Sequence, residues 1–126
     1  MRTIIAGSRE ITREQFDQAI VSLRWTPSLV VSGGARGVDN FGERWAVEHL
    51  IPVKIFPAIW KRPDGSVDKG AGFKRNVEMS KNADALFAVW DGQSRGTKHM
   101  IDTATKAGLI VQVALTGDSD GSSPLV

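Results

Sequence analysis

The sequence contains no cysteine and only two histidines, His49 and His99. Disulfide bonds, thiolate chemistry and a structural zinc site are therefore excluded, because such a zinc site takes four cysteine or histidine ligands. No apolar run approaches the ~20 residues that span a bilayer. The first residues also lack the apolar segment and cleavage site of a signal peptide. We expect a cytoplasmic protein with no membrane partner, no metal and no cofactor.

Charge of one sign is not concentrated anywhere, since 16 lysines and arginines are interspersed with 14 aspartates and glutamates. A formal net charge of +2 permits nucleic-acid binding without indicating it. A length of 126 residues is that of one ordinary domain. Glycine, serine and aspartate dominate the last residues, which is typical of a flexible tail. We therefore expect one domain over 1–115 and a tail over 116–126.

Short apolar runs alternate with amphipathic ones along the whole chain, which is typical of successive β-α units feeding a parallel sheet. Thr12 and Gln15 form a predicted capping box at the start of the first helix. The second helix begins near Asp39, ends before Pro52, and places Val38, Phe41, Trp45 and Leu50 on its buried face. The other predicted elements are strands over 2–6, 28–32, 53–56, 84–90 and 109–114, and helices over 72–82 and 96–106 with Gly108 as a C-cap.

Right-handed crossovers predict the strand order 3-2-1-4-5, numbered along the chain. The fold class is thus α/β, a Rossmann-like three-layer sandwich around a mainly parallel sheet of five strands. Ligands bind such sheets where the winding direction reverses, at the carboxyl ends of the first and fourth strands. Three glycine-bearing turns are expected to converge there: 7–9, 32–39 and 91–97.

The second and third of these turns each follow a strand and lead into a helix, so their backbone N–H groups can face an anion. The turn at 32–39 is not a dinucleotide fingerprint, because Ser32 replaces the first glycine and no acid follows about 20 residues later. It is not a Walker A loop either, because no Gly-Lys-Ser/Thr closes it. A generic phosphate cradle remains, with a plain strand-to-helix turn as the alternative.

Three further residues complete the candidate site. Arg75 and Asn76 open the third helix, where Arg75 can face the crevice while Met79 packs. Trp60 belongs to a long loop over 57–72, which is either a functional lid or a mobile insertion, and it either stacks on a base or anchors the loop. The candidate ligand-binding residues are Gly7, Ser8, Arg9, Gly33, Gly34, Arg36, Gly37, Asp39, Trp60, Arg75, Asn76, Asp91, Gly92, Ser94, Gly96 and Thr97.

Several motifs occur together in one order along residues 3–113. They are Gly7-Ser8-Arg9, Ser-Gly-Gly-Ala-Arg-Gly-Val-Asp at 32–39, Phe56-Pro57-Ala58-x-Trp60, Ala71-Gly72-x-x-Arg75-Asn76-x-x-Met79, Ala83-Asp84 and Trp90-Asp-Gly-x-Ser-x-Gly-Thr97. This set resembles the SLOG superfamily, specifically its small YspA-like members. The superfamily includes the LOG-type phosphoribohydrolases and the Rossmann-like core of the DNA-processing protein A family. The resemblance implies a Rossmann-like fold that binds nucleotides or nucleotide-derived signals at these loops.

The chain departs from the LOG-type enzymes directly after Thr97. Those enzymes carry glutamates for N-glycosidic cleavage at positions occupied here by Lys98, His99 and Met100. The departure favours binding of a nucleotide or ADP-ribose-derived ligand, by a sensor or sequestering module that is not an enzyme. The alternatives are a phosphoribohydrolase whose acid comes from Asp39, Asp91 or a partner subunit, and a single-stranded DNA binder. LOG-type relatives self-associate, so the resemblance also implies a homo-oligomer.

Overall fold

The computed structural model describes residues 1–116. Apart from Thr116, the predicted tail lies outside the described residues. The elements follow one another as β1 (Arg2–Gly7), α1 (Arg13–Ile20), β2 (Leu29–Ser32), α2 (Val38–Glu48), β3 (Val53–Ile55), α3 (Ala71–Lys81), β4 (Ala85–Trp90), α4 (Arg95–Lys106) and β5 (Ile110–Leu115). Every predicted strand and helix is present, with its ends moved by a few residues at most.

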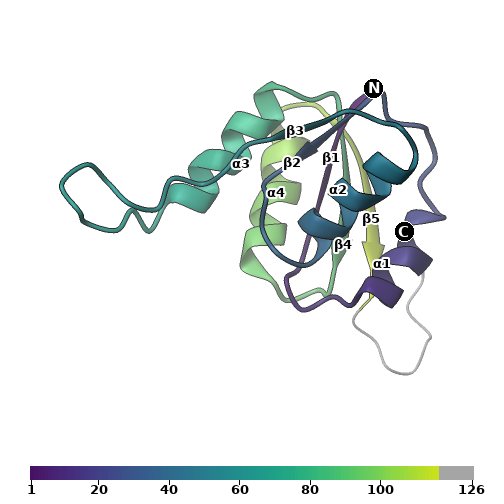
Figure 1. Ribbon diagram of the computed structural model, residues 1–126, viewed down its shortest axis with the longest axis horizontal. Coiled ribbons are helices and arrows are strands. Elements are labelled where there is room, and N and C mark those ends of the chain that lie inside the picture. The colour runs from purple at the N-terminus through teal and green to yellow at the C-terminus, as the bar shows by residue number, and fades with distance from the viewer. Residues whose placement is uncertain (117–126) are drawn as a thin grey trace.

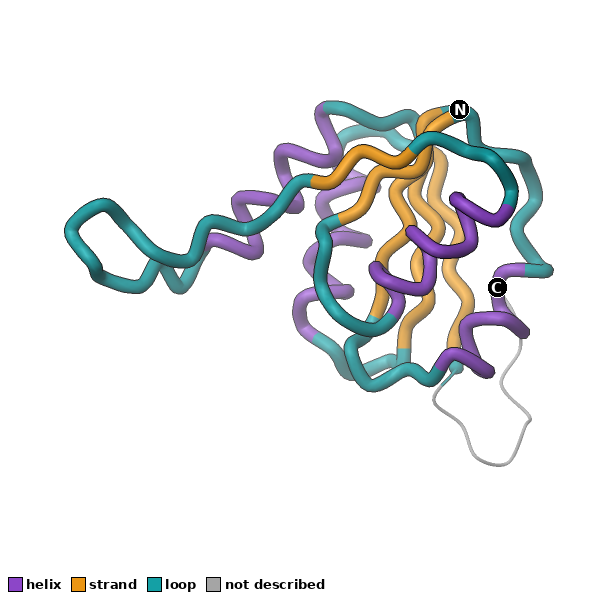
Figure 2. The backbone as a smooth tube through the Cα atoms, in the orientation of Figure 1, coloured by secondary structure: helices purple, strands orange, loops and turns teal. Residues whose placement is uncertain are grey.

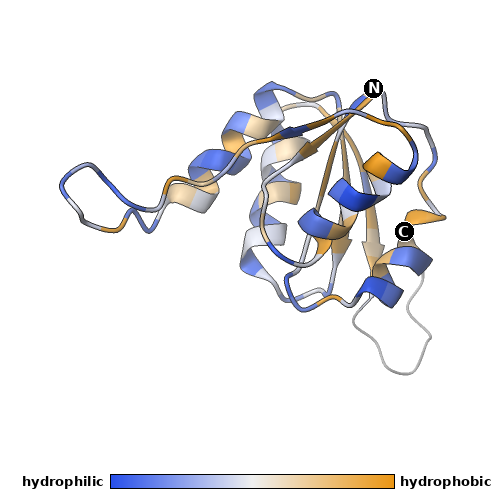
Figure 3. Cartoon of the chain, in the orientation of Figure 1, coloured by the Kyte–Doolittle hydropathy of each residue, from blue (hydrophilic) through white to orange (hydrophobic). Residues whose placement is uncertain are grey.

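The five strands form one parallel sheet in the order β3-β2-β1-β4-β5 (Figures 1 and 2). This confirms the predicted fold class and strand order. The reversal of winding lies between β1 and β4, which pair over five residues from Thr3 with Ala85 to Gly7 with Val89. The strands of the sheet are coloured mainly as hydrophobic in Figure 3, and residues 85–89 of β4 are all buried, as expected for a parallel strand that is covered on both faces.

Alternate residues of the strands divide the core into two layers. Ile5 and Phe87 point to the side of α1 and α2, where Phe16 is fully buried. Ile4 and Leu86 point to the side of α3 and α4 and pack with Met79 and Met100. Each helix pair thus covers one face of the sheet, which gives the three-layer sandwich.

The helix ends follow the sequence signals with one exception. At α1 the predicted capping box forms, since Gln15 N donates to Thr12 Oγ1 at 3.1 Å and Thr12 N to Gln15 Oε1 at 2.9 Å. Gly108 has a φ of 82° directly after the C-cap of α4. Leu50 was wrongly expected on the buried face of the second helix. It is 92% exposed with a φ of 58°, because α2 ends at Glu48 and the chain turns away.

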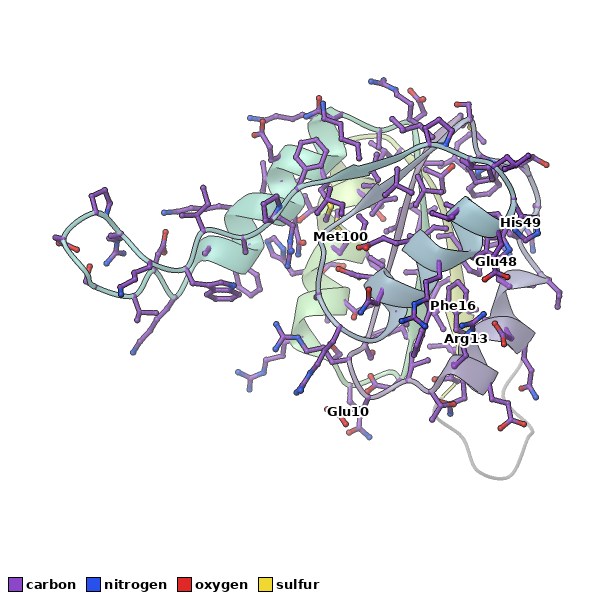
Figure 4. The ribbon with its side chains drawn as sticks, viewed as in Figure 1. Glu10, Arg13, Phe16, Glu48, His49 and Met100 are labelled. Atoms are coloured by element: carbon purple, nitrogen blue, oxygen red, sulfur yellow. The ribbon has the colours of Figure 1, made fainter. Side chains whose placement is uncertain are left out.

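Helices α1 and α2 are also joined at the surface. Arg13 and Glu48 point toward each other in Figure 4, with 3.4 Å between Arg13 Nη2 and Glu48 Oε1. Both side chains are more than 40% exposed, so this ion pair contributes little to stability. Among residues 1–116, no helix has the length and apolar character that crossing a membrane requires.

Residues 57–70, called the arm below, project from the body of the molecule between β3 and α3 (Figures 1 and 2). The two limbs of the arm meet at a bridge between Lys61 and Val67, and Asp68 N donates to Trp60 O at 2.6 Å. Near the base of the arm, Lys74 Nζ of α3 lies 2.7 Å from Asp68 Oδ2. The arm is therefore an ordered hairpin-like projection whose base rests on the start of α3.

Candidate functional site

A cleft of about 490 Å³ lies at the carboxyl ends of β1 and β4, at the reversal of winding. The loop after β1, the first turns of α3 and α4, and Trp60 of the arm form its walls. Met79 and Met100, each about 1% exposed, form an apolar floor. In Figure 4 Met100 lies inside the molecule, whereas Glu10 stands at its outer edge. The sheet topology thus opens one cavity where the sequence places the candidate residues.

Most of the candidate residues line this cleft. They come from five separate segments of the chain, which the parallel sheet brings to one edge. Those in the lining are Gly7, Ser8, Arg9, Asp39, Trp60, Arg75, Asn76, Asp91, Ser94, Gly96 and Thr97.

The remaining candidates, Gly33, Gly34, Arg36, Gly37 and Gly92, lie outside the lining. Gly33 is buried beneath Arg75, and a Cβ there would lie 2.5 Å from Arg75 Nη1. Gly37 has a φ of 81°, and a Cβ there would lie 2.8 Å from Arg9 Cα. Arg36 is exposed. The glycines of this turn therefore allow close packing of the chain, and only Ala35 and Asp39 of the turn reach the cleft.

Two amides of the turn after β2 donate to side-chain oxygens of the same turn. Gly34 N donates to Ser32 Oγ at 3.1 Å, and Ala35 N donates to Asp39 Oδ2 at 3.2 Å. Ser32 Oγ in turn donates to Glu43 Oε2 at 2.6 Å. This turn is closed by its own side chains, so these amides are not open donors for a ligand.

In the turn after β4, too, backbone amides donate to a side chain of the same turn, here that of Asp91. Gln93 N and Ser94 N both donate to Asp91 Oδ1 at 2.8 Å. Burial raises the pKa of the Asp91 carboxyl, but these hydrogen bonds outweigh it, so the pKa lies below its ordinary value. Asp91 N donates to Ser8 Oγ at 3.3 Å, which ties this turn to the loop after β1. Asp91 is therefore an ionised group inside the cleft.

Arg75 connects α3 to the turn after β2. Its Nη1 donates to Gly33 O at 2.6 Å and its Nε donates to Asn76 Oδ1 at 3.2 Å. Asn76 Nδ2 lies 3.1 Å from His99 Nδ1 and donates to Gly96 O at 3.4 Å. Burial lowers the pKa of Arg75 from its ordinary value, although the nearby Asp39 opposes this. These bonds hold the guanidinium in one position at the cleft wall.

Asp39 is the most deeply buried charged residue of the lining, at 6% exposed. Burial raises the pKa of Asp39 to about 6, while the bond from Ala35 and the charges of Arg75 and Arg9 act in the opposite direction. Glu43, one turn along α2, adds to the increase. A carboxyl group that titrates near neutral pH in a cleft is typical of functional sites.

The cleft has an aromatic side that the sequence indicated only through Trp60. Trp60 and Phe73 are 45% and 49% exposed, and both contribute to the lining. Phe73 stacks on His99 with ring centroids 4.0 Å apart and an interplanar angle of 14°. A Cβ at Gly72 would lie 3.4 Å from Trp60 Cη2, so the indole covers the start of α3.

The candidates chosen from the sequence did not include Phe73, Lys69 and Ala35, which also line the cleft. Phe73 could have been found from the helical spacing, because it lies three residues before Asn76 and therefore on a neighbouring face of the same helix. Basic and acidic side chains are balanced in the lining: Arg9, Lys69 and Arg75 against Glu10, Asp39 and Asp91. The cleft is therefore not strongly positive.

No protein-family model matches the chain. The solved structure of DNA processing protein A (DprA) from Streptococcus pneumoniae shares the fold, with a TM-score of 0.73 and 15% sequence identity. The match covers 95% of this chain and 52% of the DprA chain, so this chain spans about half the length of DprA.

A relative with a closer sequence is the Gene 61 protein of Mycobacterium phage D29. The two are 34% identical in an alignment over 117 residues that covers 87% of this chain and 93% of the phage protein. Identity of this level over nearly the full length of both chains shows common descent. The chain therefore belongs to the family of the Gene 61 protein of Mycobacterium phage D29.

Proposed function

We propose that the cleft binds a nucleotide or an ADP-ribose-derived ligand, cyclic forms included, and that the protein is a cytoplasmic sensor or sequestering module. The observation that carries the proposal is the meeting of an aromatic side, Trp60 and Phe73, with two arginines, Arg9 and Arg75, at the reversal of winding. Aromatic side chains stack on bases, arginines pair with phosphates, and this edge of an α/β sheet is where ligands bind.

The hydrogen bonds within the turns refine how the ligand would bind. Because Asp39 and Asp91 already accept from the turn amides, the arginine side chains would hold the anionic group. The hydroxyls of Ser8, Ser94 and Thr97 would add contacts. Hydroxyls of the ribose would donate to the ionised carboxylate of Asp91 and would bond to the amide group of Asn76. Balanced charge in the lining favours a ligand with one or two negative charges over a triphosphate.

We also propose that the family belongs to the SLOG superfamily, among its small YspA-like members. The ordered motifs of residues 3–113 support this assignment, as does a fold like that of DprA. Self-association is part of this proposal, and exposed apolar side chains such as Ile59, Val67 and Val77 are compatible with it. Sedimentation of the purified protein at several concentrations tests it, and a single monomeric species at all of them would contradict it.

Isothermal titration calorimetry against nucleoside monophosphates, cyclic nucleotides and ADP-ribose tests the binding proposal. We expect at least one of these compounds to bind the parent protein. Arg75→Ala should weaken that binding about tenfold or more, which is ~1.4 kcal/mol. Arg44→Ala is the matched control, because Arg44 is exposed on α2 outside the cleft lining. No binding by any compound, or equal binding by the Arg75 and Arg44 variants, would refute the proposal.

A hydrolase is the alternative, and the buried Asp39 in the lining is the observation that favours it. With its pKa at about 6, this carboxyl could hold the proton that a leaving base requires in N-glycosidic cleavage. Chromatography of nucleoside monophosphates after incubation at high protein concentration distinguishes the two functions. Release of free base by the parent but not by Asp39→Asn would favour the hydrolase.

Single-stranded DNA is a weaker alternative, suggested by the name and fold of DprA. Such binding depends on neutralised phosphates, so the affinity would fall steeply with salt. The balance of charge in the cleft and a net charge of +2 argue against it. A steep salt dependence in a fluorescence anisotropy titration with an oligonucleotide would reverse this ranking.

A further inference from the structure

The buried carboxylate of Asp39 lies among charged groups from three parts of the chain. Arg75 of α3 lies beside it, since a Cβ on Gly33 would be 2.5 Å from Arg75 Nη1 and 2.8 Å from Asp39 Oδ2. The charges of Arg9, in the loop after β1, and of Glu43, one turn along α2, also act on this carboxylate. Ala35 N donates to Asp39 Oδ2 at 3.2 Å. Asp39, Arg9 and Arg75 all contribute to the lining of the cleft. Any anion held by the two arginines would therefore lie close to a buried carboxylate.

The positive charges of Arg9 and Arg75 can interact either with the carboxylate of Asp39 or with a bound anion, and the two interactions compete. In the unliganded protein their positive charges favour the ionised form of Asp39, against burial and the charge of Glu43. A bound anion would offset those charges and add a negative charge beside the carboxylate. Like charges near a buried group disfavour its ionised form. Of the charged groups in this cluster, the Asp39 carboxylate is the one that can become neutral, because an arginine does not lose its proton in a protein.

We propose that binding of an anionic ligand in the cleft is coupled to protonation of Asp39, so that the protein takes up a proton as the ligand binds. This inference rests on the proposed function and extends it to the regulation of the same cleft. The ligand and the proton stabilise each other, because coupling between two binding sites is reciprocal.

The pKa of Asp39 determines how the affinity for the anion changes with pH. The pKa of Asp39 is about 6 without ligand, and the bound anion raises it further. Affinity for the anion should therefore be constant below about pH 6 and should decrease above it. The decrease approaches tenfold per pH unit until the pKa of the complex is reached, since one proton is taken up per ligand.

The first experiment needs no nucleotide and uses sulfate as the probe, because sulfate does not titrate in this range. The Asp39 carboxyl is titrated by carbon-13 NMR in sodium chloride and in sodium sulfate of equal ionic strength. We expect the midpoint to rise in sulfate for the parent protein. For Arg75→Gln we expect a midpoint that is already raised in chloride and responds little to sulfate. An equal midpoint in both salts for the parent would overturn the inference.

The second experiment uses cyclic AMP and ADP-ribose, whose phosphate groups do not titrate between pH 6 and 8. Calorimetry in two buffers of different ionisation enthalpy measures proton uptake directly on the parent protein. We expect uptake that approaches one proton per ligand above pH 6. It should disappear in Asp39→Asn and persist in Asp102→Asn, a matched carboxylate variant on α4 outside the cleft lining.

The outcomes separate the two proposals. Ligand binding without proton uptake would overturn the coupling and leave the proposed function in place. If neither compound binds, the response of Asp39 to sulfate alone decides the coupling, and the proposed function is decided by the calorimetric titrations that also include nucleoside monophosphates.

Discussion

Asp39 shows how burial changes the chemistry of one side chain. Its pKa in the folded protein is about 6, above the ordinary value of about 3.9 for aspartate. The folded protein thus binds this proton more tightly than the unfolded chain does. The resulting stabilisation is fully present below about pH 4 and is lost as the pH rises through 6.

Asp39→Asn should therefore change the pH dependence of stability. Asparagine retains an oxygen that can accept from Ala35 N, but it has no charge to desolvate. The free energy of unfolding of the variant, taken relative to that of the parent, should be higher at pH 7 than at pH 4 by on the order of 2–3 kcal/mol. Urea denaturation at both pH values measures the difference. A difference that stays constant across this range would show that Asp39 is not desolvated.

Two glycines of the cleft should respond oppositely to alanine. A Cβ at Gly7 would clash with Val89 O and with the side chain of Val38, whereas Gly96 faces open space in the first turn of α4. We expect Gly7→Ala to cost about 1–3 kcal/mol or more. Gly96→Ala should leave stability unchanged or raise it by up to about 1 kcal/mol. Thermal melting of the pair tests this, and a similar loss in both variants would contradict it.

Among the helices, α1 is the one whose start the sequence specifies most fully. Thr12 and Gln15 form a reciprocal pair of hydrogen bonds, so Thr12→Ala should destabilise the protein by about 1 kcal/mol. Thr105→Ala is the matched control, because its hydroxyl bonds to Ile101 O within α4 and caps no amide. Urea denaturation that gives equal losses for both variants would argue against capping as the source of stability.

The hydrogen-bond partners of the amides in the glycine turns could not be predicted from single helices, strands and turns. From sequence, the turns at 32–39 and 91–97 have amides that can face an anion. In the folded chain Asp39 and Asp91 accept from amides of their own turns. Pattern and spacing predicted the turns correctly. Which acceptor an amide finds depends on the rotamer and burial of a nearby aspartate, and these are set by packing.

On the scale of the whole molecule, the arm joins the body only at its base, so it can be altered separately from the core. Trp60 lies near that base and lines the cleft, whereas the tip beyond the bridge of Lys61 and Val67 does not. Trp60→Ala should weaken nucleotide binding about three- to tenfold, the loss of one aromatic stack. Replacing residues 62–66 by two glycines should change neither binding nor melting temperature. Equal binding by the parent and the Trp60 variant would remove the indole from the site.

The sequence by itself determined the β-α alternation, the parallel sheet, the strand order and the edge of the sheet at which the cleft lies. These properties depend on hydropathic periodicity and on the handedness of crossovers, which act through local geometry. Only the tertiary structure decided which of the candidate residues line the cleft and which lie outside it. It turned Gly33 and Gly37 inward to the packed chain, brought Phe73 into the same lining as Trp60, and buried Asp39 among charges from distant segments. Burial and charge proximity result from contacts between residues far apart in the sequence, so no local pattern encodes them.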